Sequence, residues 1–322
     1  MNALSWLRQG WRQSLALVGK GFCMGAADVV PGVSGGTMAF ILGIYAQFLA
    51  ALRSFDRSWL EALLRLRVRS ALTRPHWGFL LPLFAGIVAA LLFFTRVVPL
   101  PELLKTHPEP VYGLFFGLIV GSILVLLPTV RTWNPRAWAC LGLGLGLGLV
   151  VVTAVPATTP DAPWFVFLSG ALAIAAMMLP GVSGSFVLLL LNKYETVFGA
   201  IGRFDFAIII PFGLGVLVGF VAFSRLLGWL LERYFQAMLL AIIGLLTASL
   251  WVIWPFQERQ YVLVRGKERP MGSTPLWPED WNDTVALTVV TTILGLGLVV
   301  ILHAIAQRRG WTTATAPSNT PS

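Results

Sequence analysis

The chain has 322 residues, of which 57% are hydrophobic and only 11% are charged, and its mean hydropathy is +0.80. Soluble domains carry roughly 25% charged residues, so this composition excludes an ordinary soluble protein and indicates a polytopic membrane protein. The formal net charge of +9 does not indicate a nucleic-acid partner, because the basic residues cluster in short loops beside apolar segments, as the positive-inside rule describes.

Two apolar arms, residues 15–30 and 33–52, follow a short basic segment and meet at Pro31. Pro31 removes a backbone donor and fixes φ, and the glycines that follow it loosen the chain. Each arm is near or below the ~20 residues that a spanning helix needs. We therefore expect residues 15–52 to form a re-entrant helical hairpin that enters the membrane and returns to the same side.

The next segment, residues 53–77, is rich in arginine, and its leucines recur at helical spacing. This pattern predicts an amphipathic helix in the membrane interface over residues 58–74. A second pair of apolar arms meets at Pro180 and predicts a second re-entrant hairpin over residues 164–201. Further apolar stretches predict membrane-spanning helices at about 78–95, 111–128, 138–156, 207–224, 236–255 and 284–306.

The charges of the loops predict one consistent topology. Loop 129–137 carries arginines and no acid, and two arginines follow the last span, so we expect both segments to be cytoplasmic together with residues 53–77. This places the long loop 256–283 outside and both termini in the cytoplasm, provided that each hairpin returns to its own side. Residues 308–322 are rich in Ser, Thr and Pro and predict a disordered tail.

The two halves of the chain, residues 1–156 and 157–307, align with each other. One constant spacing matches the prolines, serines and tyrosines of the hairpins, namely Pro31, Ser34 and Tyr45 with Pro180, Ser183 and Tyr194. Each half would contain a hairpin and three spans, and an odd number of crossings turns the second half upside down. The predicted fold is therefore an all-α polytopic membrane protein built from two inverted-topology repeats, whose hairpin tips meet near the midplane.

Each tip is predicted to be an anion site. The helix after the break begins near Ser34 or Ser183, where backbone N–H groups lack partners and the helix dipole is positive, a combination that binds phosphate. The candidate phosphate-binding residues are Ser34, Gly35, Gly36, Thr37, Ser183, Gly184 and Ser185, and the helix breaks are Pro31, Gly32, Pro180 and Gly181. The alternative interpretation is that these small residues only permit tight helix packing.

Five further residues are candidates for coupling or gating. Asp28 lies beside the first break and either caps a broken helix end or carries H⁺ or Na⁺. Tyr45 and Tyr194 follow the tip serines by about three helical turns, which would place each on its tip's helix face, as a ligand contact or an interfacial anchor. Lys193 and Glu195 form either an interfacial charge pair or a gate that attracts an anionic headgroup.

The histidines do not indicate a metal or a catalytic site. His76, His107 and His303 are scattered and lack metal-ligand spacing, and no nucleophile–His–acid set is evident. We therefore expect no cofactor.

The sequence from Gly25 to Thr37, followed by Leu42-Gly43-Ile44-Tyr45, closely resembles the signature of the bacterial polyprenyl-phosphate translocase family. The second signature, residues 179–185 with Tyr194, resembles it too. The resemblance implies a flippase in the bacterial plasma membrane that returns undecaprenyl phosphate from the outer to the inner leaflet by alternating access, and not an enzyme. The halves differ, because Met177 stands where the first half has Asp28.

Two other functions remain open from the residues. An integral membrane polyprenyl-diphosphatase would share the inverted repeats, the hairpins and a Pro-Gly-x-Ser signature. Such enzymes place an Arg after that Ser, however, where this chain has Gly35 and Gly184. An inorganic-anion transporter that uses the same tips is the second alternative.

Overall fold

The computed structural model describes residues 10–29, 35–55, 57–65, 67, 73–98, 100–154, 159–264, 267–278 and 280–308. Within these ranges, six helices are long and apolar enough to cross a membrane, which confirms the predicted all-α polytopic fold. They lie where the hydropathy of the sequence predicts spans: α6 (Trp77–Arg96), α8 (Pro108–Leu126), α9 (Pro135–Thr153), α13 (Phe206–Arg233), α14 (Phe235–Ile253) and α15 (Asp283–Arg308).

The same glycine-mediated helix pair occurs in both halves of the chain. α1 (Trp11–Val29) packs along α6, and α10 (Pro163–Met178) packs along α13. A Cβ added to Gly86 would overlap the carbonyl oxygen of Val18, and a Cβ added to Gly215 would overlap that of Phe167. Only glycine permits backbones to approach this closely.

The remaining spans pair between the halves. α8 packs against α15, and α9 packs against α14. Glycines again make the contact, because a Cβ on Gly117 would overlap the carbonyl oxygen of Thr292 and a Cβ on Gly244 would overlap that of Leu141. α8 and α14 form the centre of the bundle, since 50% and 61% of their spans are buried, whereas only 6% of the span of α13 is buried.

The second arm of each hairpin is two short helices, so the prediction of one continuous arm is wrong. α2 (Gly35–Ile41) and α3 (Tyr45–Arg53) meet at an angle of 120°. α11 (Gly184–Leu190) and α12 (Tyr194–Arg203) are separated at the corresponding place in the second half. Tyr45 and Tyr194 consequently begin new helices and do not lie on the helix of their own tip.

Both bends have the same backbone structure. Gly43 has φ +68° and Asn192 has φ +51°, and glycine and asparagine are the residues that adopt this left-handed conformation at helix ends. In the first bend the amide of Ile44 donates to the carbonyl of Ala39, and that of Gly43 donates to Phe40. The amides of Lys193 and Asn192 make the same two bonds to Leu188 and Leu189. Each bend is therefore a Schellman motif.

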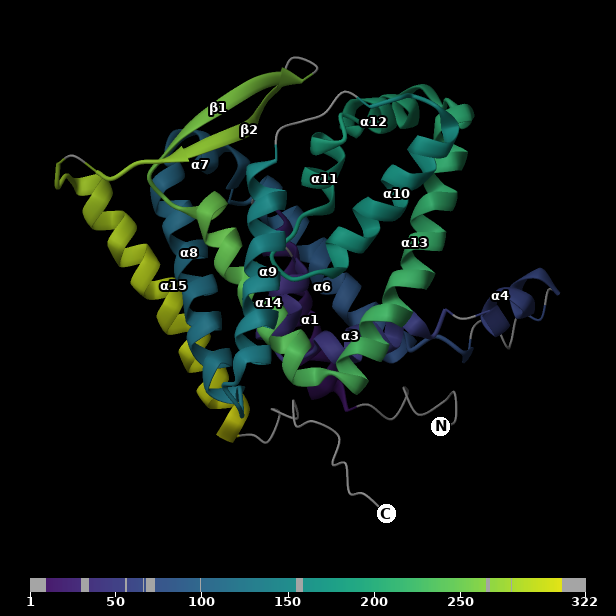
Figure 1. Cartoon of the computed structure of the whole chain (residues 1–322), viewed down its shortest axis with the longest axis horizontal. Helices are drawn as coiled ribbons and strands as arrows, with labels where there is room; N and C mark the ends of the chain where they lie inside the picture. The colour runs from purple at the N-terminus through teal and green to yellow at the C-terminus, as the bar shows by residue number, and fades with distance from the viewer. Residues whose placement is uncertain are drawn as a thin grey trace.

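Shorter elements cover the two ends of the bundle (Figure 1). α3 and α4 (Arg57–Leu64) lie at the lower end, whereas α7 (Leu100–Thr106), α12 and the strands β1 (Gln257–Val264) and β2 (Lys267–Pro275) lie at the upper end. The antiparallel β1–β2 hairpin was not predicted. α4 covers the first part of the predicted interfacial helix, and much of the remainder lies outside the described residues. η2 (Leu127–Thr129) extends α8.

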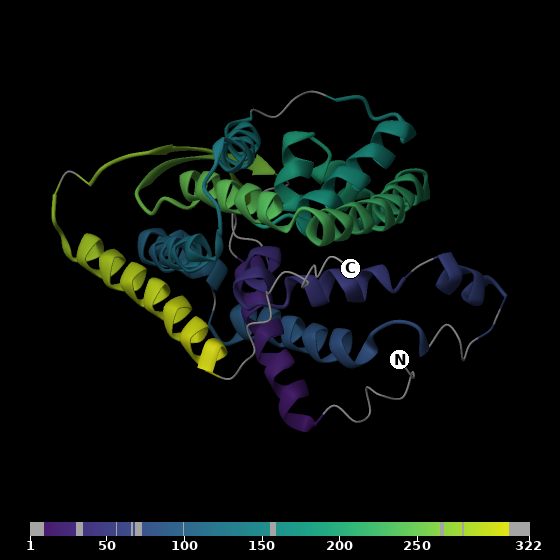
Figure 2. The same cartoon turned by 60° about the horizontal axis from the view of Figure 1, so that its bottom comes forward.

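The hairpin-bearing parts of the two halves form separate groups. Figure 2 shows the purple and blue helices of the first half below the teal and green helices of the second half. α3 reaches from the first group to α13 in the second group. The candidate site lies where α2 also crosses between the groups, at the break after α10.

Candidate functional site

Asp28 contacts the first residue of the helix that follows the first break. Its Oδ1 accepts a hydrogen bond of 2.7 Å from the backbone N–H of Gly35, at the start of α2. This is the contact expected of a cap, because the first amides of a helix have no intrahelical acceptor. Pro31, Gly32 and Ser34 lie outside the described residues.

The second break has an apolar side chain in the equivalent place. A Cβ added to Gly35 would overlap the Asp28 carboxylate, and a Cβ added to Gly184 would overlap the side chain of Met177. The two side chains therefore occupy equivalent positions at the two tips. A thioether accepts hydrogen bonds only weakly, so the second tip lacks the anionic cap that the first tip has.

Two hydrogen bonds connect the first hairpin to the second break. The N–H of Gly181 donates to Oγ1 of Thr37 over 2.7 Å, and the hydroxyl of Tyr45 donates to the carbonyl of Met178 over 2.5 Å. Met178 is the last residue of α10, where carbonyls lack intrahelical partners. Thr37 and Tyr45 are both buried, so α2 and the start of α3 lie directly against the second break.

A small pocket lies beside the second tip. The space between its walls is about 320 Å³, a figure that includes the open side. Its walls come from the end of α9, the second tip and α14: Val151, Gly181, Val182, Ser183, Phe186 and Ser249. Oγ of Ser183 lies 2.9 Å from Oγ of Ser185. Gly35, Gly36 and Thr37 do not line this pocket.

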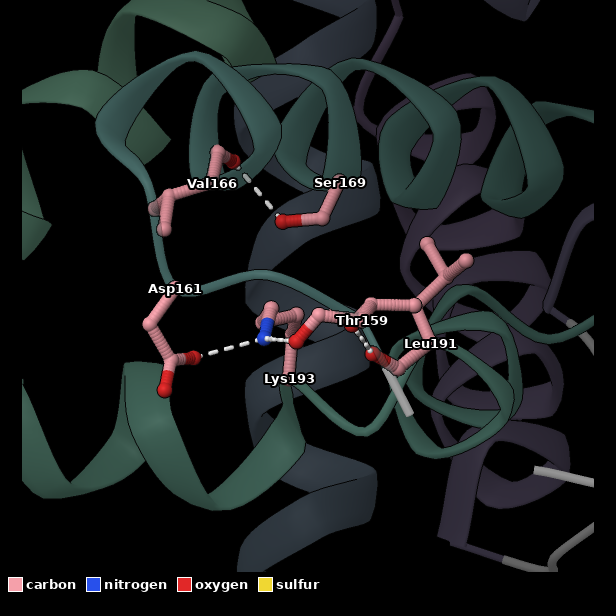
Figure 3. A network of polar contacts seen from close by, with 6 residues as sticks. All are labelled: Thr159, Asp161, Val166, Ser169, Leu191 and Lys193. Carbon is pink, nitrogen blue, oxygen red and sulfur yellow. Dashed lines mark hydrogen bonds and ion pairs between the residues drawn. The ribbon is translucent and has the colours of Figure 1, made fainter. Parts of the chain in front are cut away.

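Lys193 is held in a polar network at the bend between α11 and α12 (Figure 3). Only 1% of its side chain is exposed, and its Nζ lies 2.6 Å from Oδ1 of Asp161 and donates to the carbonyl of Thr159 over 3.0 Å. The hydroxyl of Thr159 donates to the carbonyl of Leu191 in the same bend. Of the two interpretations of Lys193 and Glu195, the interfacial pair between them is not formed, because Lys193 pairs with Asp161 and Glu195 is exposed.

Tyr194 differs from Tyr45 in its surroundings. Its ring stacks on Phe198 of the next turn of α12, with 4.4 Å between the ring centroids, and it is only partly buried. The two tyrosines therefore occupy matching sequence positions but distinct environments.

Lys20 is a polar residue of this region that the sequence patterns did not single out. Its Nζ donates to the carbonyl of Leu42 over 3.2 Å, at the end of α2. Thr159 makes the corresponding bond to Leu191 at the end of α11. A carbonyl freed by a helix break inside a membrane must find such a donor. The signal in the sequence was a lysine within an apolar run, which is costly unless it has a role.

No metal centre is present among the described residues, because no three His, Cys, Asp or Glu side chains lie close enough together to bind an ion. The polar groups at the breaks are instead hydroxyls, backbone amides and one carboxylate. Hydroxyls and amides are the donors that phosphate oxygens accept from.

Comparison with known proteins places these features in a family. The model of the undecaprenyl phosphate translocase-like family matches residues 24–269, which include both helix breaks. The chain belongs to this family.

Two relatives of this chain are named polyprenyl-phosphate transporters. The one from Vibrio cholerae is 36% identical over 291 residues, which is 89% of this chain and 92% of the relative. The one from Staphylococcus aureus is 32% identical over 256 residues, which is 73% of this chain and 84% of the relative. No solved structure matches the chain significantly.

Proposed function

We propose that this protein moves undecaprenyl phosphate from the outer to the inner leaflet of the bacterial plasma membrane, with the phosphate bound beside the helix breaks and the polyprenyl tail in lipid. Membership of the family and the names of the two relatives support the substrate class. The observation that carries the mechanism is the hydrogen bond between Thr37 and Gly181, because it joins the two hairpins at the break itself.

The headgroup binds at the second tip in this proposal. Asp28 already accepts the first amide of α2, and its charge would repel a phosphate there. At the second tip Met177 replaces the acid, and the hydroxyl of Ser183 lines an open pocket. Removing phosphate from water is the barrier to crossing, and donors that are already oriented replace its hydration.

An inverted repeat supplies the two states that alternating access needs. Three features support such a repeat. The α1–α6 pair of the first half recurs as α10–α13 in the second, and each half has a Schellman bend. In addition, α8 and α9 of the first half pair with α15 and α14 of the second. α3 and α12 lie at opposite ends of the bundle in Figure 1, as hairpins that enter from opposite faces would. We assign the lower end, which includes α4, to the cytoplasm together with both termini, because its loops are rich in arginine.

Asp28 has a structural role as a cap in this mechanism, and a second role in binding H⁺ or Na⁺ is the alternative. A carboxylate that only caps can be replaced by an amide oxygen, whereas one that carries a proton or a cation cannot. The Asp28 variants described in the Discussion separate the two.

The test is leaflet exchange of undecaprenyl phosphate in liposomes that contain the purified protein, with and without a pH gradient. We expect the protein to accelerate exchange, and Ser183→Ala to slow it at least severalfold. Ser169→Ala is the matched control, because the Ser169 hydroxyl bonds to the carbonyl of Val166 in its own helix (Figure 3).

Three outcomes would contradict the proposal. Equal exchange in liposomes with and without protein would refute transport of this lipid. Release of inorganic phosphate from undecaprenyl diphosphate would support the diphosphatase instead. Flux of free phosphate without lipid exchange would support an inorganic-anion transporter.

A further inference from the structure

The first hairpin is docked on the opposite half of the protein. Arg53, the last residue of α3, lies 2.6 Å from the carboxylate of Glu232 near the end of α13. Phe55 follows α3 and contacts Phe220 of α13 edge-on, with 6.5 Å between the ring centroids. Tyr45 and Leu49 on the same helix are 3% and 2% exposed. α3 therefore closes the lower end of the bundle against α13.

The equivalent face of the second hairpin has no such cover. Phe198 of α12 occupies the place of Leu49 and is 46% exposed, and Phe204 occupies the place of Phe55 and is 74% exposed. Ile201 lies between them on the same face and is 49% exposed. α12 packs against α13 of its own half and has no comparable packing against α6 among the described residues.

The surface that α12 would need is also exposed. The contacts of Gly86 with Val18 and of Gly215 with Phe167 place α6 and α13 in the same register. In this register Leu91 of α6 corresponds to Phe220 of α13, and Leu91 is 40% exposed whereas Phe220 is partly covered by Phe55. The faces of α12 and α6 that correspond to the docked α3–α13 pair are thus both exposed, and they come from different halves of the chain.

We propose that α3 and α12 are alternating gates. In the conformation described, α3 is docked on α13 and the end of the bundle that carries α12 is open. In the opposite conformation α12 docks on α6, Phe204 contacts Leu91, and α3 separates from α13. This inference rests on the proposed transport function and assigns its two gates to named helix faces. It also specifies that the conformation described is closed at the cytoplasmic end.

The two gates differ in one respect. The α3 gate contains the Arg53–Glu232 ion pair, whereas the position of α12 that corresponds to Arg53 is Gly202. Within the described ranges no ion pair connects α12 to α6. The α3 gate therefore has an additional attraction, and we expect it to be the closed gate in the absence of substrate.

Cysteine pairs test the exchange. In a background in which Cys23 and Cys140 are replaced by alanine, one protein carries Phe55→Cys with Phe220→Cys and another carries Leu91→Cys with Phe204→Cys. A short, reducible bifunctional thiol reagent then reports which pair is close. Without substrate, we expect the 55–220 pair to cross-link at least tenfold faster than the 91–204 pair, and undecaprenyl phosphate to raise the rate of the 91–204 pair.

Transport measurements complete the test. Cross-linking of either pair should stop lipid exchange, and a reductant should restore it, while proteins with a single cysteine keep their rate after the same treatment. The inference is overturned if the 91–204 pair never cross-links with substrate present, or if a cross-linked 55–220 pair transports at the uncross-linked rate. Absence of lipid exchange in the unmodified protein would refute the transport function, whereas mutually exclusive cross-linking would still support the gates.

Discussion

Thr37→Val is the most informative single change, because it removes one hydrogen bond without changing the shape of a buried side chain. Thr37 is 1% exposed, and its hydroxyl accepts the N–H of Gly181 over 2.7 Å. Valine has a methyl group in place of this hydroxyl, so the Gly181 amide would be buried without an acceptor. Leaving a buried donor unsatisfied costs about 1–3 kcal/mol.

The cost applies to the conformation in which α2 is docked on the second break. A difference of about 1–3 kcal/mol corresponds to roughly a 5- to 150-fold change in an equilibrium constant. We therefore expect Thr37→Val to lower the free energy of unfolding in detergent and to reduce the rate of 55–220 cross-linking. Hydrogen bonds between helices within membranes contribute less, about 0.6 kcal/mol on average. We therefore expect the loss of stability in Thr37→Val to lie near the lower end of the range.

Thr37→Ser is the matched control, because serine retains the hydroxyl and loses only a methyl group. Both variants are compared by denaturant unfolding in the same detergent and by the cross-linking rate. If valine and serine at this position give equal unfolding free energies and equal cross-linking rates, the bond to Gly181 does not hold α2 against the second break.

Three further predictions concern other contacts. If the carboxylate of Asp28 only caps α2, Asp28→Asn should keep both the stability of the protein and its rate of lipid exchange. Asp28→Leu removes the cap and should cost about 0.5–2 kcal/mol of stability. Loss of exchange with retained stability in Asp28→Asn would instead indicate that Asp28 carries a proton or a cation. Asp161→Ala should destabilise the protein, because the buried Lys193 ammonium then keeps only the Thr159 carbonyl and the Phe165 ring as partners. Adding Lys193→Met should recover part of the loss, because no buried charge then remains without its counter-ion. A double variant less stable than Asp161→Ala would contradict this. Gly215→Ala should lower the free energy of unfolding by about 1–3 kcal/mol, because the added methyl group overpacks against α10. Gly213→Ala should leave it unchanged, because a Cβ at that position would meet no atom within 4 Å. Thermal unfolding of the two variants measures the difference.

The membrane spans were predictable from the sequence because their signal is local. A run of about 20 apolar residues has few alternatives to a membrane helix, and the six spans lie close to the predicted positions. The fold class follows from the same signal. The β1–β2 hairpin was not predicted, because the many charges of residues 256–283 indicate only a loop outside the membrane. Its signal is nevertheless present, since Tyr261-Val-Leu-Val followed by an Arg-Gly pair is typical of a strand that ends in a turn.

The bends within the second arms were missed although the residues that cause them are visible. Gly43 and Asn192 occupy matching positions in the two halves, and both residue types favour a left-handed helix end. The apolar residues on either side continue without interruption, so hydropathy does not report the bend. The prediction of Tyr45 on the helix of its own tip is wrong for this reason. Tyr45 instead begins α3, and its bond to Met178 connects segments 133 residues apart.

The candidate site was only partly predictable because its partners come from different halves. The positions of the helix breaks follow from the repeated motif, but the contacts of the residues beside them do not: Thr37 accepts a bond from Gly181 of the other half, whereas Ser183 lines the pocket. The pairing of Lys193 with Asp161 could not be predicted, since α10, the second break and α11 separate the two residues along the chain. The unequal docking of α3 and α12 was also inaccessible, because two aligned halves predict equal environments.

The Schellman bend between α2 and α3 has a consequence for the gate proposed above, because it fixes the angle between the two helices. Two backbone hydrogen bonds close the bend, so in the proposed exchange we expect a rotation of α3 away from α13 to turn α2 as well. Because α2 carries Thr37 and α3 carries Tyr45, the same rotation pulls on the second break at the place where a headgroup would rest. In the proposed exchange, a bend of three residues would thereby connect a movement at the end of the bundle to the second break.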